Sequence, residues 1–88
     1  MERYRVLIKP SAKKELLAIS AKKDRQRIVR KIDALAENPR PPGCEKLSGY
    51  DRYRIRQGKY RVVYGIEDDK LIVLIIKIGH RRDIYRAL

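Results

Sequence analysis

The most constraining feature of the chain is a predicted β-hairpin. Two β-prone runs, Tyr53–Arg56 and Tyr60–Tyr64, flank a short turn that contains Gly58. A two-residue loop, whether Gln57–Gly58 or Gly58–Lys59, pairs odd positions of the first strand with even positions of the second. Either register therefore gives one apolar face, made of Tyr53, Ile55, Tyr60, Val62 and Tyr64, and one cationic face, made of Arg54, Arg56 and Arg61.

A first strand and two helices are expected before this hairpin. Residues 4–9 alternate well enough to predict a half-buried strand. Ser11 is the expected N-cap of a first helix, whose buried stripe would be Ala12, Leu16 and Ile19. A second helix is predicted to bury Ile28, Val29, Ile32, Leu35 and Ala36. It should stop at Asn38–Pro39, because the residue before a proline avoids the α region.

The C-terminal part is expected to complete one sheet. Leu71–Ile76 is apolar without alternation, which predicts a central strand buried on both faces. The order β-α-α-β-β-β then defines an α+β domain, a small antiparallel sheet with two N-terminal helices packed on one face. The other face would stay open and carry the arginines. Residues 83–88 would form a short C-terminal helix or a tail.

The charge balance points to anionic partners. The 88 residues suffice for one domain, 1–88, and carry a net charge of +12 from 23 Lys and Arg against 11 Asp and Glu. Such a field attracts polyanions, so nucleic acid is the first candidate, an acidic protein the second and an anionic membrane the third. The longest apolar run, Leu71–Ile76, is far shorter than the roughly 20 residues of a membrane span. A single cysteine, Cys44, and the absence of a signal peptide favour the cytoplasm.

The arginine face has an ordinary explanation and a functional one. Exposed sheet faces are usually charged, so solubility alone would account for it. The row is nearly uniform in sign, however, with only Asp51 beside Arg52, Arg54, Arg56, Lys59 and Arg61. In either register an arginine lies opposite Arg61, and like charges paired across strands are destabilising. Because arginine also binds phosphate oxygens in bidentate geometry, the row favours a phosphate-binding surface.

Two residues near the C-terminus can carry proton chemistry. Tyr85 would either pack against the sheet edge or accept a proton, and Arg61, Arg81 and Arg82 would lower its pKa from about 10 towards a useful range. His80, the only histidine, is either a surface residue at a strand end or an acid or base in a cationic pocket. One histidine and one cysteine make no metal site, and the sequence has no phosphate-binding glycine loop or nucleophile elbow. Neither a metal nor a cofactor is expected.

Four segments together resemble a known family. Tyr4–Ala12, Leu35–Pro41, Leu47–Tyr64 and Gly79–Tyr85 are similar to the RelE/ParE superfamily of toxins from type II toxin–antitoxin systems, and in particular to its RelE-like branch. The resemblance implies the fold predicted above. It also implies an endonuclease that enters the ribosomal A site and cleaves messenger RNA.

The resemblance assigns roles to individual residues. Arg61 matches the strand arginine that contacts the scissile phosphate, Arg81 the second catalytic arginine, and Tyr85 the tyrosine that stacks on a base and assists proton transfer, with His80 as an alternative base. The remaining basic residues are expected to contact the RNA backbone: Arg52, Arg54, Arg56, Lys59 and Arg82. The implied reaction is metal-independent attack of a ribose 2′-OH on its own 3′-phosphate. Two departures are that Arg54 and Arg56 stand where RelE has lysines, and that Tyr85 follows Arg81 more closely.

The partners implied are messenger RNA, the ribosome and a short acidic antitoxin that wraps the helices and covers the cationic face, with no membrane and no small-molecule cofactor. Two other functions fit the same scaffold. ParE-like members inhibit DNA gyrase and typically lack the arginine–tyrosine set. A non-catalytic RNA-binding relative would keep the basic face and tolerate Tyr85→Phe.

Overall fold

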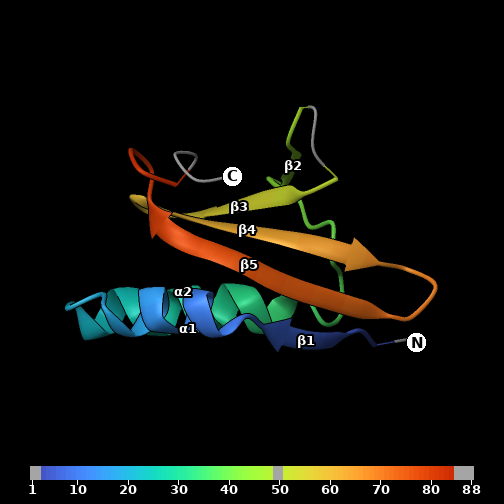
Figure 1. Ribbon diagram of the computed structural model, residues 1–88, viewed down its shortest axis with the longest axis horizontal. Helices are drawn as coiled ribbons and strands as arrows, with labels where there is room; N and C mark the ends of the chain where they lie inside the picture. The colour runs from blue at the N-terminus through green and yellow to red at the C-terminus, as the bar shows by residue number, and fades with distance from the viewer. Residues whose placement is uncertain (1–2, 49–50, 85–88) are drawn as a thin grey trace.

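The structure is a computed structural model that describes residues 3–48 and 51–84. Within these residues the elements are β1 (Arg5–Ile8), α1 (Pro10–Leu17), α2 (Lys22–Ala34), β2 (Glu45–Lys46), β3 (Tyr53–Gln57), β4 (Tyr60–Glu67) and β5 (Ile72–His80). Figure 1 shows both helices on one side of the sheet and the turn that follows β5 on the other side. The predicted α+β class, with a strand, two helices and then further strands, is confirmed.

The sheet is mixed, whereas the sequence predicted antiparallel pairing. Its strand order is β1-β5-β4-β3-β2, and β1 runs parallel to β5 while the other neighbours are antiparallel. The prediction followed from hairpin succession, which does not govern β1, because the two helices separate it from the other strands. The strand β2 was not predicted. Its two residues, Glu45 and Lys46, pair with Arg54 and Tyr53, and two residues are too few to show a pattern.

The β3–β4 hairpin has the two faces that were predicted. Gln57 pairs with Tyr60, so the loop is Gly58–Lys59, and Gly58 adopts a φ of 59°, which glycine reaches without strain. The pair Ile55–Val62 belongs to the core on the helix side. Arg56 and Arg61 lie directly opposite each other on the other side.

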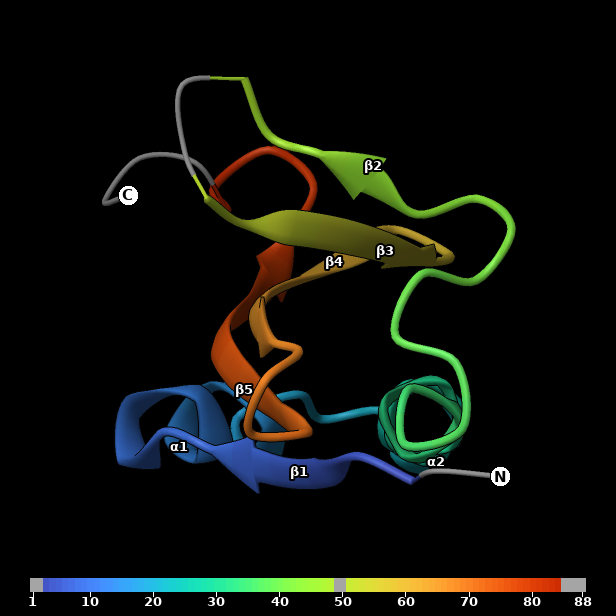
Figure 2. The ribbon, with the colours of Figure 1, turned by 90° about the vertical axis from the view of Figure 1, so that its right-hand side faces the viewer.

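One continuous core fills the space between the helices and the sheet. Its buried members are Ala12, Ile19, Ile28, Ile32 and Leu35 from the helical half and Ile55, Val62, Tyr64, Val73, Ile75 and Ile78 from the strands. Figure 2 shows α1 and α2 at the same level, below β3 and β4. Val29 was predicted to be buried but is 40% exposed. It lies about 100° round the helix from Ile28 and so falls outside the buried stripe.

The first helix begins earlier than predicted. Pro10 is its first residue and Lys9 is the N-cap, so Ser11 lies inside the helix and is not the cap. Proline suits this position because the missing N–H would have no partner within the helix. The prediction of two separate helices is confirmed, since α1 ends at Leu17 and the next helix starts at Lys22.

The strand β5 is central, as predicted, but it is fully buried on one face only. It lies between β1 and β4. Val73 and Ile75 point into the core and are completely buried, whereas Leu74 and Ile76 are only partly buried. Helices cover the first face, while much less of the chain covers the second.

A β-bulge interrupts the pairing of β4 with β5. Val63 pairs with Lys77 and Tyr64 pairs with Ile75, so Ile76 is an extra residue on β5. The bulge resets the alternation of side chains, and Ile78 therefore returns to the core.

The connector after α2 is tied to the turn between β4 and β5. The Arg40 guanidinium donates two hydrogen bonds to the Asp68 carboxylate, at 3.1 and 2.9 Å, and Tyr4 Oη donates a third at 2.6 Å. These hydrogen bonds, chiefly that from Arg40, lower the pKa of Asp68 from 3.8 to about 2. The buried Tyr64 hydroxyl donates to the Pro39 carbonyl at 2.7 Å, and burial raises the pKa of this phenol. The segment around Asn38–Pro41 therefore has a structural role.

Candidate phosphate-binding site

The sheet brings basic residues together at the β3–β4 turn, called here the hairpin end and defined by Arg56, Lys59, Arg61, Arg81 and Arg82. Arg61 lies near the start of β4 on the face away from the helices. Its guanidinium donates hydrogen bonds to the carbonyls of Gly58 at 3.0 Å and Tyr60 at 2.9 Å, which hold it against the turn.

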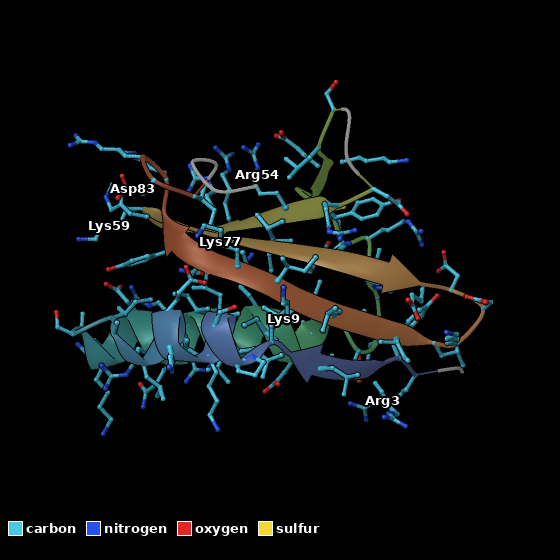
Figure 3. The ribbon with its side chains drawn as sticks, viewed as in Figure 1. Arg3, Lys9, Arg54, Lys59, Lys77 and Asp83 are labelled. Atoms are coloured by element: carbon cyan, nitrogen blue, oxygen red, sulfur yellow. The ribbon has the colours of Figure 1, made fainter. Side chains whose placement is uncertain are left out.

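Arg81 lies at the same end of the sheet, although it is distant from Arg61 in the sequence. It follows β5 directly, and its backbone N–H donates to the Lys59 carbonyl at 2.8 Å. The antiparallel register, in which Arg61 lies opposite Gly79, thus places residue 81 alongside the turn. Arg81 and Arg82 are both exposed. Figure 3 shows Lys59 and Asp83 at this common end of the sheet.

The face that carries the arginines was predicted to be open but is partly covered. After β5 the chain turns back, and the N–H groups of Asp83 and Ile84 donate to the His80 carbonyl at 2.9 and 3.1 Å. The Ile84 side chain is completely buried, and a Cβ on Gly79 would approach its Cδ1 to 3.3 Å. The turn therefore packs directly on the glycine opposite Arg61. It provides apolar cover for a face on which Val63 is also completely buried.

His80 and Arg61 lie on different faces of the sheet. His80 pairs with Tyr60, and their rings meet edge to face with centroids 6.2 Å apart. Because side chains alternate along a strand, this places the imidazole on the Tyr60 side, opposite that of Arg61. His80 Nδ1 accepts a hydrogen bond from the Arg82 N–H at 3.2 Å. A neutral ring that accepts at Nδ1 carries its proton on Nε2.

The arginine row is divided, although the sequence suggested one nearly uniform strip. Arg54 forms an ion pair with Glu45 of the unpredicted strand β2, and its side chain is only 19% exposed. Arg52 donates to the Asp51 carbonyl at 2.9 Å and lies over Gly65, away from the turn. The structure therefore gathers Arg56, Lys59 and Arg61 at the hairpin end but separates the other two. The one sequence feature that could have predicted the ion pair of Glu45 with Arg54 was the negative charge of Glu45, which is opposite to that of the arginine row.

Two predictions concern residues that the structure does not describe. Tyr85 lies outside the described residues, as does most of the C-terminal helix that was predicted over 83–88. Residues 81–84 form turns, so the described beginning of that segment is not helical.

No group of three or more metal-ligating side chains occurs within residues 3–48 and 51–84. Over the same part of the chain, both helices are too short and too polar to cross a membrane.

Solved structures identify the class of fold. The RelE chain of the archaeal RelE–RelB complex from Pyrococcus horikoshii is 32% identical, with a TM-score of 0.81, and the match covers 97% of this chain and 99% of that one. The isolated Escherichia coli RelE toxin is 30% identical, with a TM-score of 0.76 over 88% of this chain and 83% of that one. The fold is therefore that of a RelE-like toxin.

Sequence comparisons then assign the chain to a family. An Escherichia coli protein described as a RelE-like toxin is 30% identical over 94% of this chain and 90% of its own length. The family described as "ParE toxin of type II toxin-antitoxin system, parDE" matches residues 6–85. The chain belongs to this ParE toxin family of type II toxin–antitoxin systems.

Proposed function

We propose that the chain, as one toxin domain over residues 1–88, is an endonuclease that cleaves messenger RNA on the translating ribosome in the cytoplasm. The observation that carries the proposal is that the Arg61 guanidinium and the Arg81 backbone are both held at the β3–β4 turn. Arg61 is held there by two turn carbonyls and the Arg81 backbone is bonded to Lys59. Similarity to RelE toxins over nearly the whole chain supports the same reading.

The proposed reaction needs positioning and charge stabilisation. A ribose 2′-OH attacks the neighbouring phosphorus, so that the 2′-O–P bond forms and the P–O5′ bond breaks. The 2′ proton passes to a base, and the leaving 5′ oxygen gains a proton. The products are a 2′,3′-cyclic phosphate and a 5′-hydroxyl. Arg61 would hold the phosphate and Arg81 would stabilise the charge that develops on it, as fixed cationic donors do in other phosphoryl reactions.

Tyr85 is the proposed base in this reaction. Arginine does not lose its proton in proteins, so the base must come from another residue type. His80 is the alternative, but its ring lies on the Tyr60 side of the sheet and its Nδ1 already accepts a hydrogen bond. Cleavage should therefore be lost in Tyr85→Phe and largely retained in His80→Gln.

The other basic residues would bind the RNA backbone unequally. Arg56, Lys59 and Arg82 lie next to Arg61 and Arg81 and are exposed. Arg54 is paired with Glu45 and Arg52 is turned towards Gly65, so both would contribute less to binding. Affinity for RNA should fall steeply with salt, because each phosphate contact releases counterions.

A short acidic antitoxin is the proposed protein partner. A hollow of about 430 Å³ lies between α1 and α2, lined by Leu16, Leu17, Lys22, Arg25, Gln26, Val29 and Arg30. Leu17 is 65% exposed and Val29 is 40% exposed. Apolar side chains framed by cations suit an amphipathic segment whose polar residues are acidic.

Inhibition of DNA gyrase is a second candidate, because the matching family is named for ParE. This activity would not require Arg61, Arg81 or Tyr85 to act together.

One experiment separates the candidates. The protein is induced in cells, transcript 5′ ends within translated regions are mapped, and gyrase supercoiling is assayed in parallel. Cuts that bear a 5′-hydroxyl and disappear in Arg61→Ala and Arg81→Ala, but persist in the remote control Arg3→Ala, would support the nuclease. Blocked supercoiling with intact transcripts would reject it in favour of gyrase inhibition. Intact transcripts with normal supercoiling would reject both activities, and non-catalytic RNA binding would be the remaining function.

A further inference from the structure

A second basic surface lies on the helix side of the hairpin end, between α2 and β3. Two adjoining hollows, of about 330 and 360 Å³, share Lys31 and Ala34 among their lining residues. Together they form a groove, called here the α2–β3 groove, that is defined by Arg27, Arg30, Lys31, Ala34, Arg56 and Gln57. One end of the groove reaches the loop Pro41–Gly43 and the other reaches the residue before the β3–β4 turn.

The fold explains why the groove exists. The strand β2 pairs only with Tyr53 and Arg54, so within the described chain the outer edge of β3 has no strand partner beyond that point. The helix α2 runs below this edge. In Figure 2 the connector from α2 rises past the edge to β2 and bounds one end of the space. Arg27, Lys31 and Ala34 are spaced along one flank of α2, beside the stripe that enters the core.

All the charged residues that line the groove are cationic. Four of its lining residues are Arg or Lys, and the described residues that line it include no Asp or Glu. None of Arg27, Arg30 and Lys31 forms an ion pair within residues 3–48 and 51–84. Four cations that line one groove repel one another, and an anion bound between them would offset that repulsion.

Arg56 joins this groove to the hairpin end. Its strand position places it opposite Arg61, yet it also lines the hollow beside Lys31. The groove and the hairpin end therefore adjoin at Arg56.

We propose that the α2–β3 groove binds the sugar–phosphate backbone of RNA next to the phosphate held by Arg61. This inference deepens the proposed function and rests on it. Arg27, Arg30 and Lys31 become ligands for the flanking phosphates. The groove suits a polyanion because every charged residue that lines it is basic, and its aliphatic strand residue, Ile55, is only 4% exposed. The hollow between α1 and α2 shares Arg30 with the groove but presents exposed Leu17 and Val29.

The test measures binding without cleavage. The probe is a fluorescent 12-nucleotide RNA with 2′-O-methyl riboses, which lack the attacking hydroxyl, and its affinity for the full chain is measured by fluorescence anisotropy over a series of salt concentrations. The groove variant is R27Q/R30Q/K31Q. The matched control R3Q/R5Q/K13Q removes the same number of positive charges from three exposed residues: Arg3 before β1, Arg5 on β1 and Lys13 on α1. Figure 3 shows Arg3 at the opposite end of the molecule from Lys59. Circular dichroism and thermal melts establish that both variants are folded.

The groove variant should bind the probe about 100-fold more weakly than the wild type. Its plot of log affinity against log salt should be shallower by about 2, since each lost phosphate contact on a single strand removes about 0.7. The control should lose less than about threefold and keep its salt slope. Equal losses in the two variants would overturn the proposal. So would an unchanged RNA affinity in a groove variant that no longer binds a 12-residue polyglutamate peptide, because the groove would then serve a protein partner.

The same probe separates this proposal from the proposed nuclease activity. Groove-dependent binding in a protein that never cuts transcripts would reject the nuclease and support the groove. Cleavage of transcripts by a protein whose RNA binding does not depend on the groove would support the nuclease and reject the groove. Lys31→Arg, which keeps the charge, should retain the wild-type affinity.

Discussion

Arg56 on β3 lies directly opposite Arg61 on β4, so two guanidinium side chains share one cross-strand position beside the hairpin turn. Like charges in this relationship destabilise a sheet by about 0.2–1 kcal/mol. A phosphate bound beside the pair would offset this repulsion.

The first prediction concerns this pair. Arg56→Gln should raise the free energy of unfolding by about 0.5 kcal/mol, because it removes the repulsion. The same change should weaken RNA binding about tenfold, because Arg56 belongs to both the hairpin end and the α2–β3 groove. Urea denaturation and anisotropy measure the two effects. Equal or lower stability in the variant would contradict the repulsion, and Lys46→Gln, on the exposed strand β2, serves as the control for loss of one charge.

The second prediction concerns Glu45, which forms an ion pair with Arg54. Glu45→Gln should tighten RNA binding about two- to fivefold at low salt, because the carboxylate no longer offsets the basic face. The gain should disappear as the salt concentration rises. Glu37→Gln removes the same charge from the turn after α2 and should have a smaller effect. A weaker affinity in the Glu45 variant would show that the ion pair helps to place Arg54 for binding.

The third prediction compares two glycines of the sheet. A Cβ at Gly79 would lie 3.3 Å from Ile84 Cδ1, whereas one at Gly65 would meet nothing closer than 3.7 Å. Gly79→Ala should therefore lower stability by about 1 kcal/mol relative to Gly65→Ala, because the buried Ile84 side chain must move by a few tenths of an ångström to admit the new methyl group. Denaturant unfolding measures the difference, and the NMR signal of the Ile84 δ1 methyl reports the displacement. An unshifted methyl signal in Gly79→Ala would contradict the packing.

The fourth prediction is an acid-dependent loss of stability. Folding lowers the pKa of Asp68 from 3.8 to about 2, so this group contributes stability above pH 4 that is lost as the pH falls towards 2. Asp68→Asn should lower the melting temperature at pH 6 and reduce its fall between pH 4 and pH 2. Asp69→Asn, in the same turn, should melt with the wild-type pH profile. An unchanged profile for Asp68→Asn would mean that the Arg40 clamp does not stabilise the fold.

Periodicity alone was sufficient to predict the hairpin faces, because a two-residue loop fixes the parity of every cross-strand pair. It could not predict β2, because a strand of only two residues shows no period. Nor could it predict the direction of β1, which depends on the path of the helices. The covering of the sheet by Ile84 depends on a turn that has no hydrophobic pattern of its own.

For the candidate site, the sequence was most informative where register decides the outcome. Either possible loop placed an arginine, Arg54 or Arg56, opposite Arg61, and in the structure it is Arg56. The separation of His80 from Arg61 follows from the same alternation once β5 is aligned with β4, but that alignment contains a bulge that the sequence did not reveal. Arg27, Arg30 and Lys31 were missed because a charged helix flank is ordinarily a solvated surface.

The extra residue at Ile76 has a consequence for how the length of this chain can change over evolutionary time. Between the bulge and Arg81, the loss or gain of one amino acid would invert every later side chain and detach Arg81 from Lys59. Around residues 69–70, by contrast, the connection lies beyond the paired strands and can lengthen without moving the basic end. Related sequences should therefore carry insertions at that loop and keep a constant number of residues from Ile76 to Arg81.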